Sequence, residues 1–326
     1  MLRISGFGTY WKRNISGRYG QLTQVNLPQG GNVEIDYAEQ FGTPDNPNFK
    51  YVMSRVTVND GTDANDVLPE LKHGAHSLTT TYEYSDGYYD RNKKDFYGFG
   101  TVKTTFAYGN CQEDVYFNRE YYSKGCINSI TVKTVDGALL SESTTTLEDA
   151  PNPLPKKEES RIYEKSSGTG CYIATATSYK YDLRYGNCIK ITQDFGDGEQ
   201  LIGEMSYKNM DTDDKYIAGL PEKILVYGTN GKSYPLRLRT GVYDDLGQLK
   251  ELRQYWRNND SSCSRNKLAY DNYGNIQTVS DSRGAALSYK YDDVENMFVK
   301  EITQRGNDTE SYTSFIEYDA RKSIFM

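Results

Sequence analysis

Two histidines are the residues of this chain best suited to metal chemistry, and they lie three positions apart as His73 and His76. Two imidazoles at that spacing could ligate zinc, which usually takes four Cys, His or carboxylate ligands in a protein. Only Glu70 lies beside them, without a Cys or a cluster of carboxylates. We therefore expect both histidines in a solvent-exposed loop with no carboxylate or thiol converging on them, and we predict no metal site.

Nucleophilic chemistry lacks its usual residues. A catalytic triad needs a histidine, a partner acid and an activated serine or cysteine, and the sequence contains no Gly-x-Ser-x-Gly motif, which presents such a serine on a tight turn. We therefore predict that the protein is not an enzyme and needs no cofactor. It should neither cleave itself nor hydrolyse ester, peptide or glycoside substrates.

Two acidic stretches suggest calcium binding at first sight. Asp211–Asp214 precedes Glu222, but an EF-hand loop needs a ligand at its fifth position and Gly at its sixth, where this chain has Lys215 and Tyr216. The stretch Asp194–Glu199 is rich in Asp and Gly, which two consecutive turns explain. A weak surface calcium site at either stretch is the alternative, since oxygen ligands alone are unspecific.

The composition indicates thin β-sheet. Of the 326 residues, 30 are Tyr, whereas 37% are hydrophobic and the mean hydropathy is −0.76. Tyrosine suits half-buried pleated surfaces because its ring packs while its hydroxyl reaches water or a partner. Disordered chains are poor in aromatic residues, so we expect a two-sided sheet rather than disorder or a thick core.

The charge argues against nucleic-acid binding. The net charge is −7 and the isoelectric point is about 5.1, whereas neutralising phosphates needs clustered Lys and Arg. The one dense basic run, Arg91–Lys94, is flanked by Asp90 and Asp95, which is typical of a solvated turn.

Five cysteines, an odd number in a long chain, argue against a disulfide framework. Cys111 with Cys126, or Cys171 with Cys188, could pair across a hairpin, but we favour buried reduced thiols. The sequence has no apolar run of about 18 residues, so we predict no membrane span. The first residues lack the apolar core of a signal peptide, and we expect none in this chain.

Period-two alternation of apolar and polar residues is common, as in Val33–Tyr37, and helical periodicity is nearly absent. Asp136-Gly137 and Gly228–Gly231 follow β-rich runs and predict hairpin turns. We therefore predict an all-β chain of short antiparallel strands with few or no helices.

Three prolines, Pro151, Pro153 and Pro155, mark the clearest break, since proline is excluded from central strands. We predict a Pro-rich, charged surface loop over residues 149–160, between β-rich regions at 1–148 and 161–326. A domain linker is the alternative. We favour the loop because β-rich sequence of the same kind continues on both sides.

In the second region a Tyr-Asp dipeptide recurs, followed by a turn and a β-rich run. From Tyr243 onward the spacing is 27, 21 and 27 residues, which fits two strands plus loops per repeat. The Asp would cap the turn and the Gly would take a positive φ. The predicted repeat positions are Tyr181, Asp182, Gly186, Tyr243, Asp244, Gly247, Tyr270, Asp271, Gly274, Tyr291, Asp292, Tyr318 and Asp319.

These dipeptides resemble the tyrosine-aspartate (YD) repeats of Rhs proteins, of teneurins and of the B subunits of insecticidal Tc toxin complexes. Upstream, Tyr88–Gly100 is similar to a signature in the middle region of Tc toxin B subunits and SpvB-related proteins. Residues Gly20–Tyr37 and Tyr51–Gly61 are similar to other stretches of that family. The signature residues are Tyr89, Asp90, Arg91, Phe96, Gly98, Phe99 and Gly100.

The resemblance implies short antiparallel hairpins stacked as a YD-repeat spiral or open shell, in a secreted or cell-surface bacterial toxin. In that family the shell encloses a toxic C-terminal polypeptide, and an aspartic self-cleavage site lies in an Asp-Pro-Gly type motif that we do not find here. Seven residues follow Asp319, so we expect a chain that stops in mid-repeat, as a fragment or a truncated reading frame.

We therefore predict a structural scaffold, part of an Rhs- or Tc-toxin-B-like β-shell that encapsulates or presents a toxin polypeptide. Its expected partners are that cargo and other shell segments or toxin-complex subunits. The alternative is a cell-surface carbohydrate- or partner-binding module, in which exposed Tyr, Trp11 or Trp256 would stack on sugars. We favour packing as the role of the repeat tyrosines, because cross-strand aromatic pairs stabilise sheets.

Overall fold

The computed structural model describes residues 20–28, 30–40, 42–47, 50–61, 76–107, 111–149, 151, 153–164, 171–233, 235–256, 262–306 and 310–318. Within these ranges the chain forms β-strands, turns and loops, and no helix. The predicted all-β class is therefore confirmed. The chain divides into two compact units, residues 1–174 and 175–326.

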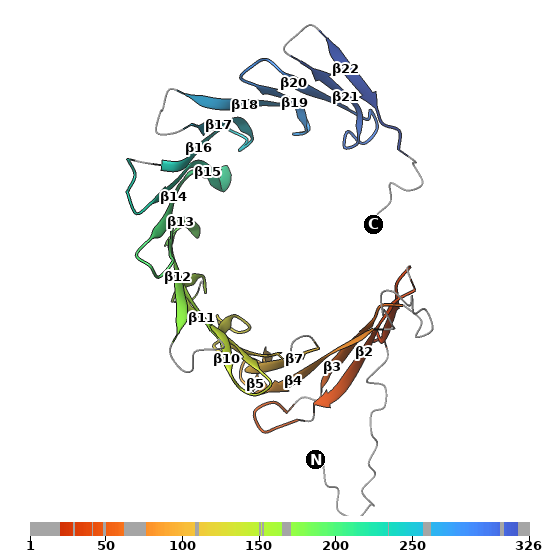
Figure 1. The fold of residues 1–326 in the computed structure, drawn as a ribbon. Coiled ribbons are helices and arrows are strands. Elements are labelled where there is room, and N and C mark those ends of the chain that lie inside the picture. Colours follow the sequence, from red (N-terminus) through yellow and green to blue (C-terminus); the bar gives the residue numbers. More distant parts are fainter. Residues whose placement is uncertain are drawn as a thin grey trace, which may run out of the picture. The chain divides into compact units, whose positions relative to one another are not determined.

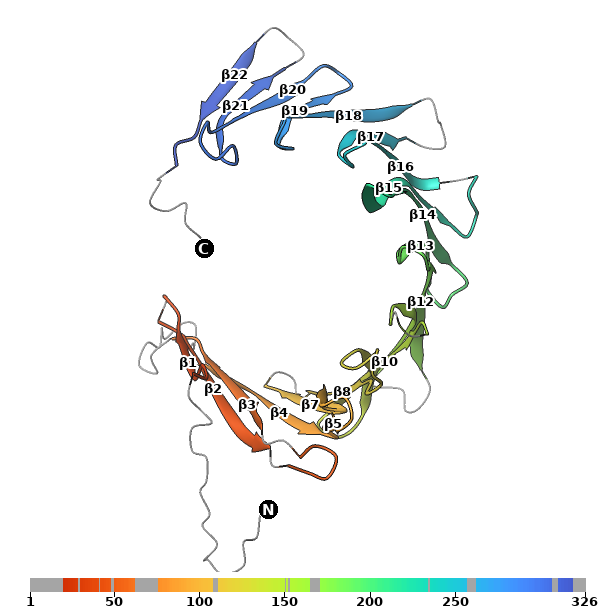
Figure 2. The ribbon, with the colours of Figure 1, turned by 180° about the vertical axis from the view of Figure 1, so that it is seen from behind.

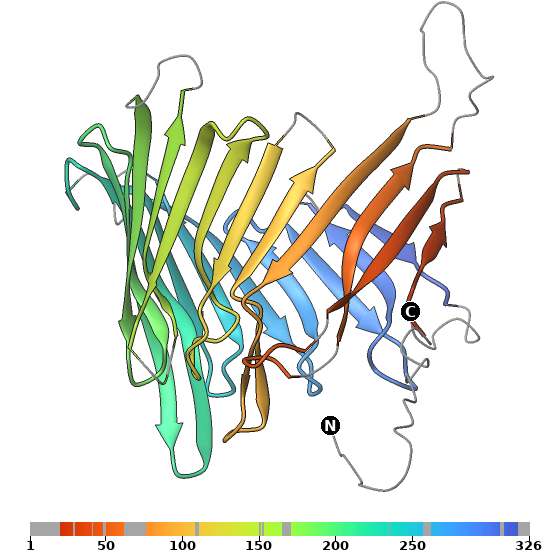
Figure 3. The same ribbon diagram turned by 90° about the horizontal axis from the view of Figure 1, so that it is seen from below.

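Unit 1 is an antiparallel meander in which each strand pairs with the next along the chain. The exception is β4, which pairs with β7 because β5 and β6 form a separate two-stranded sheet. Long neighbouring strands of this unit, orange to yellow-green, are seen from the side in Figure 3. The bounds are β1 (Gln24–Asn26), β2 (Asn32–Gln40), β3 (Lys50–Asn59), β4 (Ser77–Ser85), β5 (Tyr88–Asp90), β6 (Asp95–Gly98), β7 (Thr101–Phe106), β8 (Cys111–Phe117), β9 (Ile127–Thr134), β10 (Leu139–Leu147) and β11 (Pro155–Tyr163).

Unit 2 continues the same pattern without a skip, so that its strands follow one another in chain order (Figures 1 and 2). The bounds are β12 (Tyr172–Asp182), β13 (Asn187–Asp194), β14 (Gln200–Thr212), β15 (Lys215–Gly228), β16 (Pro235–Tyr243), β17 (Leu249–Tyr255), β18 (Cys263–Tyr270), β19 (Ile276–Asp281), β20 (Ala286–Tyr291), β21 (Val299–Arg305) and β22 (Ser311–Phe315). Its first strand begins three residues before the division between the units.

The sheet is thin, as the composition predicts. Among the described residues, Tyr97 and Tyr227 are the only buried hydrophobic side chains, each 6% exposed. Most strand residues are half-buried, because each strand touches its two neighbours but no second layer covers it. In unit 2 the register places Leu268, Val279 and Leu287 in one cross-strand row, so one face of that sheet is apolar.

Two sequence expectations are wrong in part. The loop predicted over 149–160 is shorter, since residues 155–160 begin β11. Pro155 fits there because it is the first residue of its strand and pairs with Leu147 at a register shift. The five cysteines are free thiols as expected, but Cys171 is exposed and the others are half-buried, because a single-layer sheet has no thick interior.

Candidate functional site

The Tyr-Asp dipeptides lie where a strand enters a loop, at one edge of unit 2. This Tyr-Asp edge comprises the connections β12–β13, β16–β17, β18–β19 and β20–β21, together with the β14–β15 turn. They share an edge because every second connection of a meander returns to the same side. The five remaining connections of unit 2 lie at the opposite edge.

Two loops of the Tyr-Asp edge have the same hydrogen bonds. The Asp244 backbone N–H donates to the Gln248 carbonyl (3.0 Å), and the Asp244 carboxylate accepts the N–H groups of Leu246 and Gln248 (both 2.9 Å). Asp271 repeats the pattern, with its carboxylate accepting from Tyr273 and Asn275 (both 2.9 Å). The aspartate therefore fixes the loop by binding backbone N–H groups that have no strand partner.

The loop glycines have the backbone conformation that the repeat pattern predicts. The φ angles of Gly186, Gly247 and Gly274 are +74°, +80° and +87°. In the longer loop after Asp292 no glycine is present, and Asn296 takes a φ of +54°. Asparagine is one of the few residues that tolerate this region.

The repeat tyrosines connect successive loops of the Tyr-Asp edge. The hydroxyl of Tyr270 donates to the carbonyl of Leu249 (2.9 Å), the first residue after the preceding loop. The Tyr291 hydroxyl donates in the same way to Ile276 (2.9 Å), and the Tyr243 hydroxyl donates to Pro221 (3.1 Å). Burial raises the pKa of all three phenols. Each tyrosine therefore ties its own loop to a neighbouring strand.

The long β14–β15 hairpin interrupts the repeat and contacts the loops on both sides. The carboxylate of Asp211 accepts hydrogen bonds from Arg184 (2.7 Å) and from the Tyr185 hydroxyl (3.2 Å). On the other side, the Lys208 ammonium donates to the Tyr243 carbonyl (3.2 Å), and Lys215 donates to the Asp245 carbonyl. Asp211, the first residue of the acidic stretch considered for calcium, is thus engaged in loop contacts.

Sequence reasoning missed one loop of this kind. Asp281 N–H donates to Ala285 O (2.9 Å), and the Asp281 carboxylate accepts from Arg283 (2.8 Å) and Ala285 (2.9 Å). It lies at the opposite edge, between β19 and β20. Ser280 precedes Asp281 instead of Tyr, so a search for Tyr-Asp overlooks it. The spacing Asp-x-x-Gly, with Gly284 at φ +93°, is the signal that finds it.

The signature residues form the β5–β6 hairpin of unit 1. The Asp90 carboxylate accepts the backbone N–H groups of Asn92 (2.8 Å) and Lys93 (3.1 Å) and the Tyr97 hydroxyl (2.9 Å). Those donors, the Lys93 N–H first, lower the pKa of Asp90. Burial and the hydrogen bond to Asp90 raise the pKa of Tyr97 to about 12. The Arg91 guanidinium donates to the Pro44 carbonyl (2.9 Å), which anchors the hairpin tip.

Aromatic rings and lysines pack around this hairpin. Phe96 contacts Phe99 at a ring-centroid distance of 5.5 Å, and the Lys50 ammonium lies 3.2 Å from the centroid of Phe96. Lys124 lies over the Tyr97 ring (4.9 Å) and forms an ion pair with Asp95. The glycines are constrained too: Gly98 has a φ of +96°, and a side chain at Gly100 would meet Asp86 at 2.9 Å. These contacts give the signature residues packing partners.

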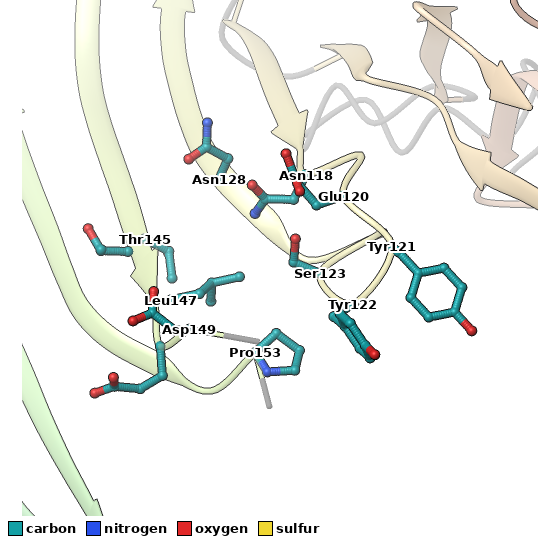
Figure 4. Close-up of a pocket in the computed structure, with 12 residues that line it drawn as sticks. Asn118, Glu120, Tyr121, Tyr122, Ser123, Asn128, Thr145, Leu147, Asp149 and Pro153 are labelled. Carbon is teal, nitrogen blue, oxygen red and sulfur yellow. The ribbon is translucent and has the colours of Figure 1, made fainter. Parts of the chain in front are cut away.

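A cavity of about 580 Å³ lies in unit 1 between the β8–β9 and β10–β11 connections. Figure 4 shows Tyr121 and Tyr122 on one side and Thr145, Leu147 and Asp149 on the other. Its carboxylates do not form a metal site, since no cluster of three or more His, Cys, Asp or Glu suited to a metal occurs among the described residues. The remaining lining residues are Asn118, Glu120, Ser123, Asn128, Thr146, Glu148 and Pro153.

The expectation for the histidines is wrong for His76. Its imidazole Nδ1 lies 3.0 Å from the Asp60 carboxylate, with 59% and 37% of the two side chains exposed. The contact arises because Asn59 and Ser77 are paired in β3 and β4, so the residues next to them also face each other. His73, Glu70, Trp11 and Asp319 lie outside the described residues, and Trp256 is 63% exposed. Tyr318, beside Asp319, packs on Phe298 at 5.2 Å.

Strands that pair in chain order within each unit define an antiparallel β-meander protein. Residues 4–129 match the family model described as the insecticide toxin TcdB middle/N-terminal region. The sequence resemblance to the middle region of Tc toxin B subunits is thereby confirmed. No curated protein matches the chain.

Solved structures of Tc toxin assemblies have a similar fold. The crystal structure of TcdB2-TccC3-Cdc42 has a TM-score of 0.54 and 11% identity, covering 86% of this chain and 23% of that chain. TcdB2-TccC3 without its hypervariable C-terminal region has a TM-score of 0.53 and 11% identity, over 85% and 23% of the two chains. The structure of a Tc holotoxin pore of Photorhabdus luminescens has a TM-score of 0.53 and 11% identity, covering 85% of this chain and 22% of that chain. This chain thus spans less than a quarter of the length of these three chains.

Proposed function

We propose that the chain is a non-enzymatic structural segment of a Tc-type toxin complex, in which it forms part of a wall around a toxin polypeptide. The observation that supports this most is the single-layer sheet: its strands are half-buried, and only Tyr97 and Tyr227 are buried hydrophobic residues in the described part of the chain. A sheet without a second layer does not enclose a core of its own. Such a single-layer sheet suits a wall that separates an enclosed polypeptide from the solvent.

The tied loops support the same role. Hydrogen bonds from Tyr243, Tyr270 and Tyr291 to neighbouring backbone carbonyls stiffen one edge of unit 2. We assign the repeat and signature positions to this structural work. Because these hydroxyls bind backbone carbonyls of the protein itself, they support a structural role for the three tyrosines.

The matched structures combine TcdB2 with TccC3, which points to a TccC3-like subunit as the partner and to an extracellular toxin complex as the setting. In the described part of the chain, no helix has the length and apolarity to cross a membrane.

Protease protection tests this function. The protein of natural length that contains this chain is produced with its TccC3-like partner, and the complex is treated with a broad-specificity protease. We expect the partner's toxin polypeptide to be degraded only after the complex is denatured. Equal degradation of the toxin polypeptide with and without the chain would contradict the proposal. Micromolar binding of a saccharide, without protection of the toxin polypeptide, would also contradict it.

A further inference from the structure

One face of unit 2 carries twice as many basic as acidic strand residues. Directly paired residues of neighbouring strands share a face, and so do alternate residues of one strand. The pairs Lys180–Lys190–Glu204 and Lys223–Thr240–Arg253–Arg265 belong to this basic face. Its basic residues are Lys180, Lys190, Lys208, Lys215, Lys223, Arg253, Arg265, Lys267, Lys290 and Arg305, and its acidic residues are Asp182, Asp194, Glu204, Glu251 and Glu301.

Part of this positive charge has no ion pair. Lys190 lies opposite Glu204 and Lys267 lies opposite Glu251, but neither lysine forms an ion pair within 4.0 Å in the described part of the chain. Arg253 and Arg265 share Glu251, at 2.9 and 4.0 Å, and Lys290 pairs with Glu301 at 2.9 Å. Glu204 is occupied by Lys232 from a loop, at 2.6 Å. With the carboxylates of the described residues, no ion pair forms for Lys180, Lys190, Lys223, Lys267 or Arg305.

Two pairs on the basic face place like charges directly opposite each other, Lys180 with Lys190 and Arg253 with Arg265. Such pairs destabilise a sheet. Glu251 bridges the two arginines, so the repulsion that an anionic partner would relieve is that between Lys180 and Lys190.

The polar face of unit 1 is a control within the same chain. There the basic strand residues Arg55, Lys103, Lys133, Lys157 and Arg161 each lie within 4.0 Å of a carboxylate, at 2.9, 3.7, 3.6, 2.8 and 3.0 Å. Among the described pairs of that face, none places like charges opposite each other. The same meander can thus balance its charges, and the excess on unit 2 is a property of that face.

We propose that the basic face of unit 2 is a docking surface for an acidic, extended polypeptide segment. The chain as a whole has a net charge of −7, so a long uniform polyanion such as a nucleic acid is repelled by the rest of the protein. A short Asp- and Glu-rich segment meets only the local cations. This inference rests on the proposed function in one respect, namely that the partner is a polypeptide.

The test measures binding of a fluorescently labelled ten-residue glutamate peptide to the full chain by anisotropy at low ionic strength. The test variant carries Lys180→Gln, Lys223→Gln and Lys267→Gln. The matched control carries Lys103→Gln, Lys133→Gln and Lys157→Gln in unit 1, which changes the net charge equally. Circular dichroism checks that all three proteins are folded.

We expect the peptide to bind the unmodified chain more weakly as salt rises, and the test variant to lose about tenfold in affinity, as removal of three exposed charge contacts implies. The control should stay within about twofold. Equal losses in the two variants would show a net-charge effect and overturn the proposal. So would the absence of peptide binding, or tighter binding of a single-stranded oligonucleotide than of the peptide. Protease protection of a cargo does not depend on these lysines, so the two proposals fail separately.

Discussion

At the scale of single residues, the aspartate that opens each loop binds several backbone N–H groups with one carboxylate. Asp292 is the extreme case, since its carboxylate accepts the backbone N–H groups of Val294 (3.1 Å), Glu295 (2.6 Å), Met297 (3.0 Å) and Phe298 (2.9 Å). These N–H groups, that of Phe298 first, hold the pKa of Asp292 well below its usual range.

Acid should therefore destabilise this loop. The carboxylate has a lower pKa in the folded state than in the unfolded state, so its contribution is fully present above about pH 4 and is lost as the pH falls further. We expect Asp292→Asn to lower the melting temperature at pH 7 and to flatten its decline between about pH 5 and pH 2. Melting curves by circular dichroism across that range measure both effects. If the melting temperature of the variant fell with pH as steeply as that of the unmodified protein, the hydrogen bonds of these N–H groups would not depend on the charge of Asp292.

Substitution of the loop glycines by alanine should reduce the folding stability by different amounts. Each has a positive φ, so alanine should destabilise by about 1 kcal/mol. At Gly247 the new methyl would also meet Ile217 at 3.2 Å, whereas at Gly186 nothing lies within 4 Å. We expect Gly247→Ala to lose more stability than Gly186→Ala in urea unfolding. Gly203→Ala is the control, because Gly203 lies in a strand with open space around it. An equal loss at Gly203 would remove the conformational explanation.

One substitution should make the fold more stable. Lys180 faces Lys190 across the β12–β13 pair. Lys180→Gln removes that repulsion and should raise stability by a few tenths of a kcal/mol at low salt, with a smaller gain at high salt because the charges are then screened. Denaturant unfolding at two ionic strengths measures this. A loss of stability at low salt would mean that Lys180 has a favourable partner.

At the scale of elements, the tyrosine hydroxyls should hold neighbouring hairpins together. Tyr270→Phe removes the hydrogen bond to Leu249 and leaves that carbonyl without its donor, so we expect a loss of about 1 kcal/mol in urea unfolding. Tyr273→Phe is the control within the same loop, since Tyr273 is 71% exposed. Equal effects of the two substitutions would argue against a tie between loops.

The sequence predicts these elements well where one local signal decides them. Period-two alternation and turns such as Asp136-Gly137 identify strands and hairpins, because each depends on a few adjacent residues. Asp281 was missed because the dipeptide Tyr-Asp mixes two separable roles, the aspartate that closes a loop and the tyrosine that ties it to another strand. Pro155 was misplaced because whether a strand tolerates proline depends on its position in the pairing.

The partners of the long β14–β15 hairpin and of His76 follow from tertiary pairing that no local pattern encodes. The contact between His76 and Asp60 depends on the register of β3 and β4, and the contact between Arg184 and Asp211 depends on how far a hairpin projects. The basic face likewise becomes visible only when the register of successive strand pairs is known, because lysines far apart in sequence are then seen to share one side.

At the scale of the whole molecule, strands pair only with their neighbours, and few side chains reach further, such as Lys50 to Phe96 and Lys208 to Tyr243. Stability should therefore be nearly additive along the chain. A chain shortened by removing residues 293–326, which include β21 and β22, should keep its β-sheet spectrum per residue. Its urea m-value should fall roughly in proportion to the surface lost. Collapse of the entire spectrum would show that the last hairpin is needed for the rest to fold.

Pairing in chain order also affects how the protein is made. Most strands of the two meanders find their partner a short connection back along the chain. The longer connections are residues 60–76, between β3 and β4, and residues 86–100, between β4 and β7, which contain the β5–β6 hairpin. Closing such short loops costs little entropy, so early strands can pair while the ribosome is still adding later ones. The growing sheet then always ends in a strand whose outer N–H and C=O groups are unpaired, which is a template for another chain. Crowding of nascent chains on one messenger is therefore the condition under which this protein is most exposed to misassembly.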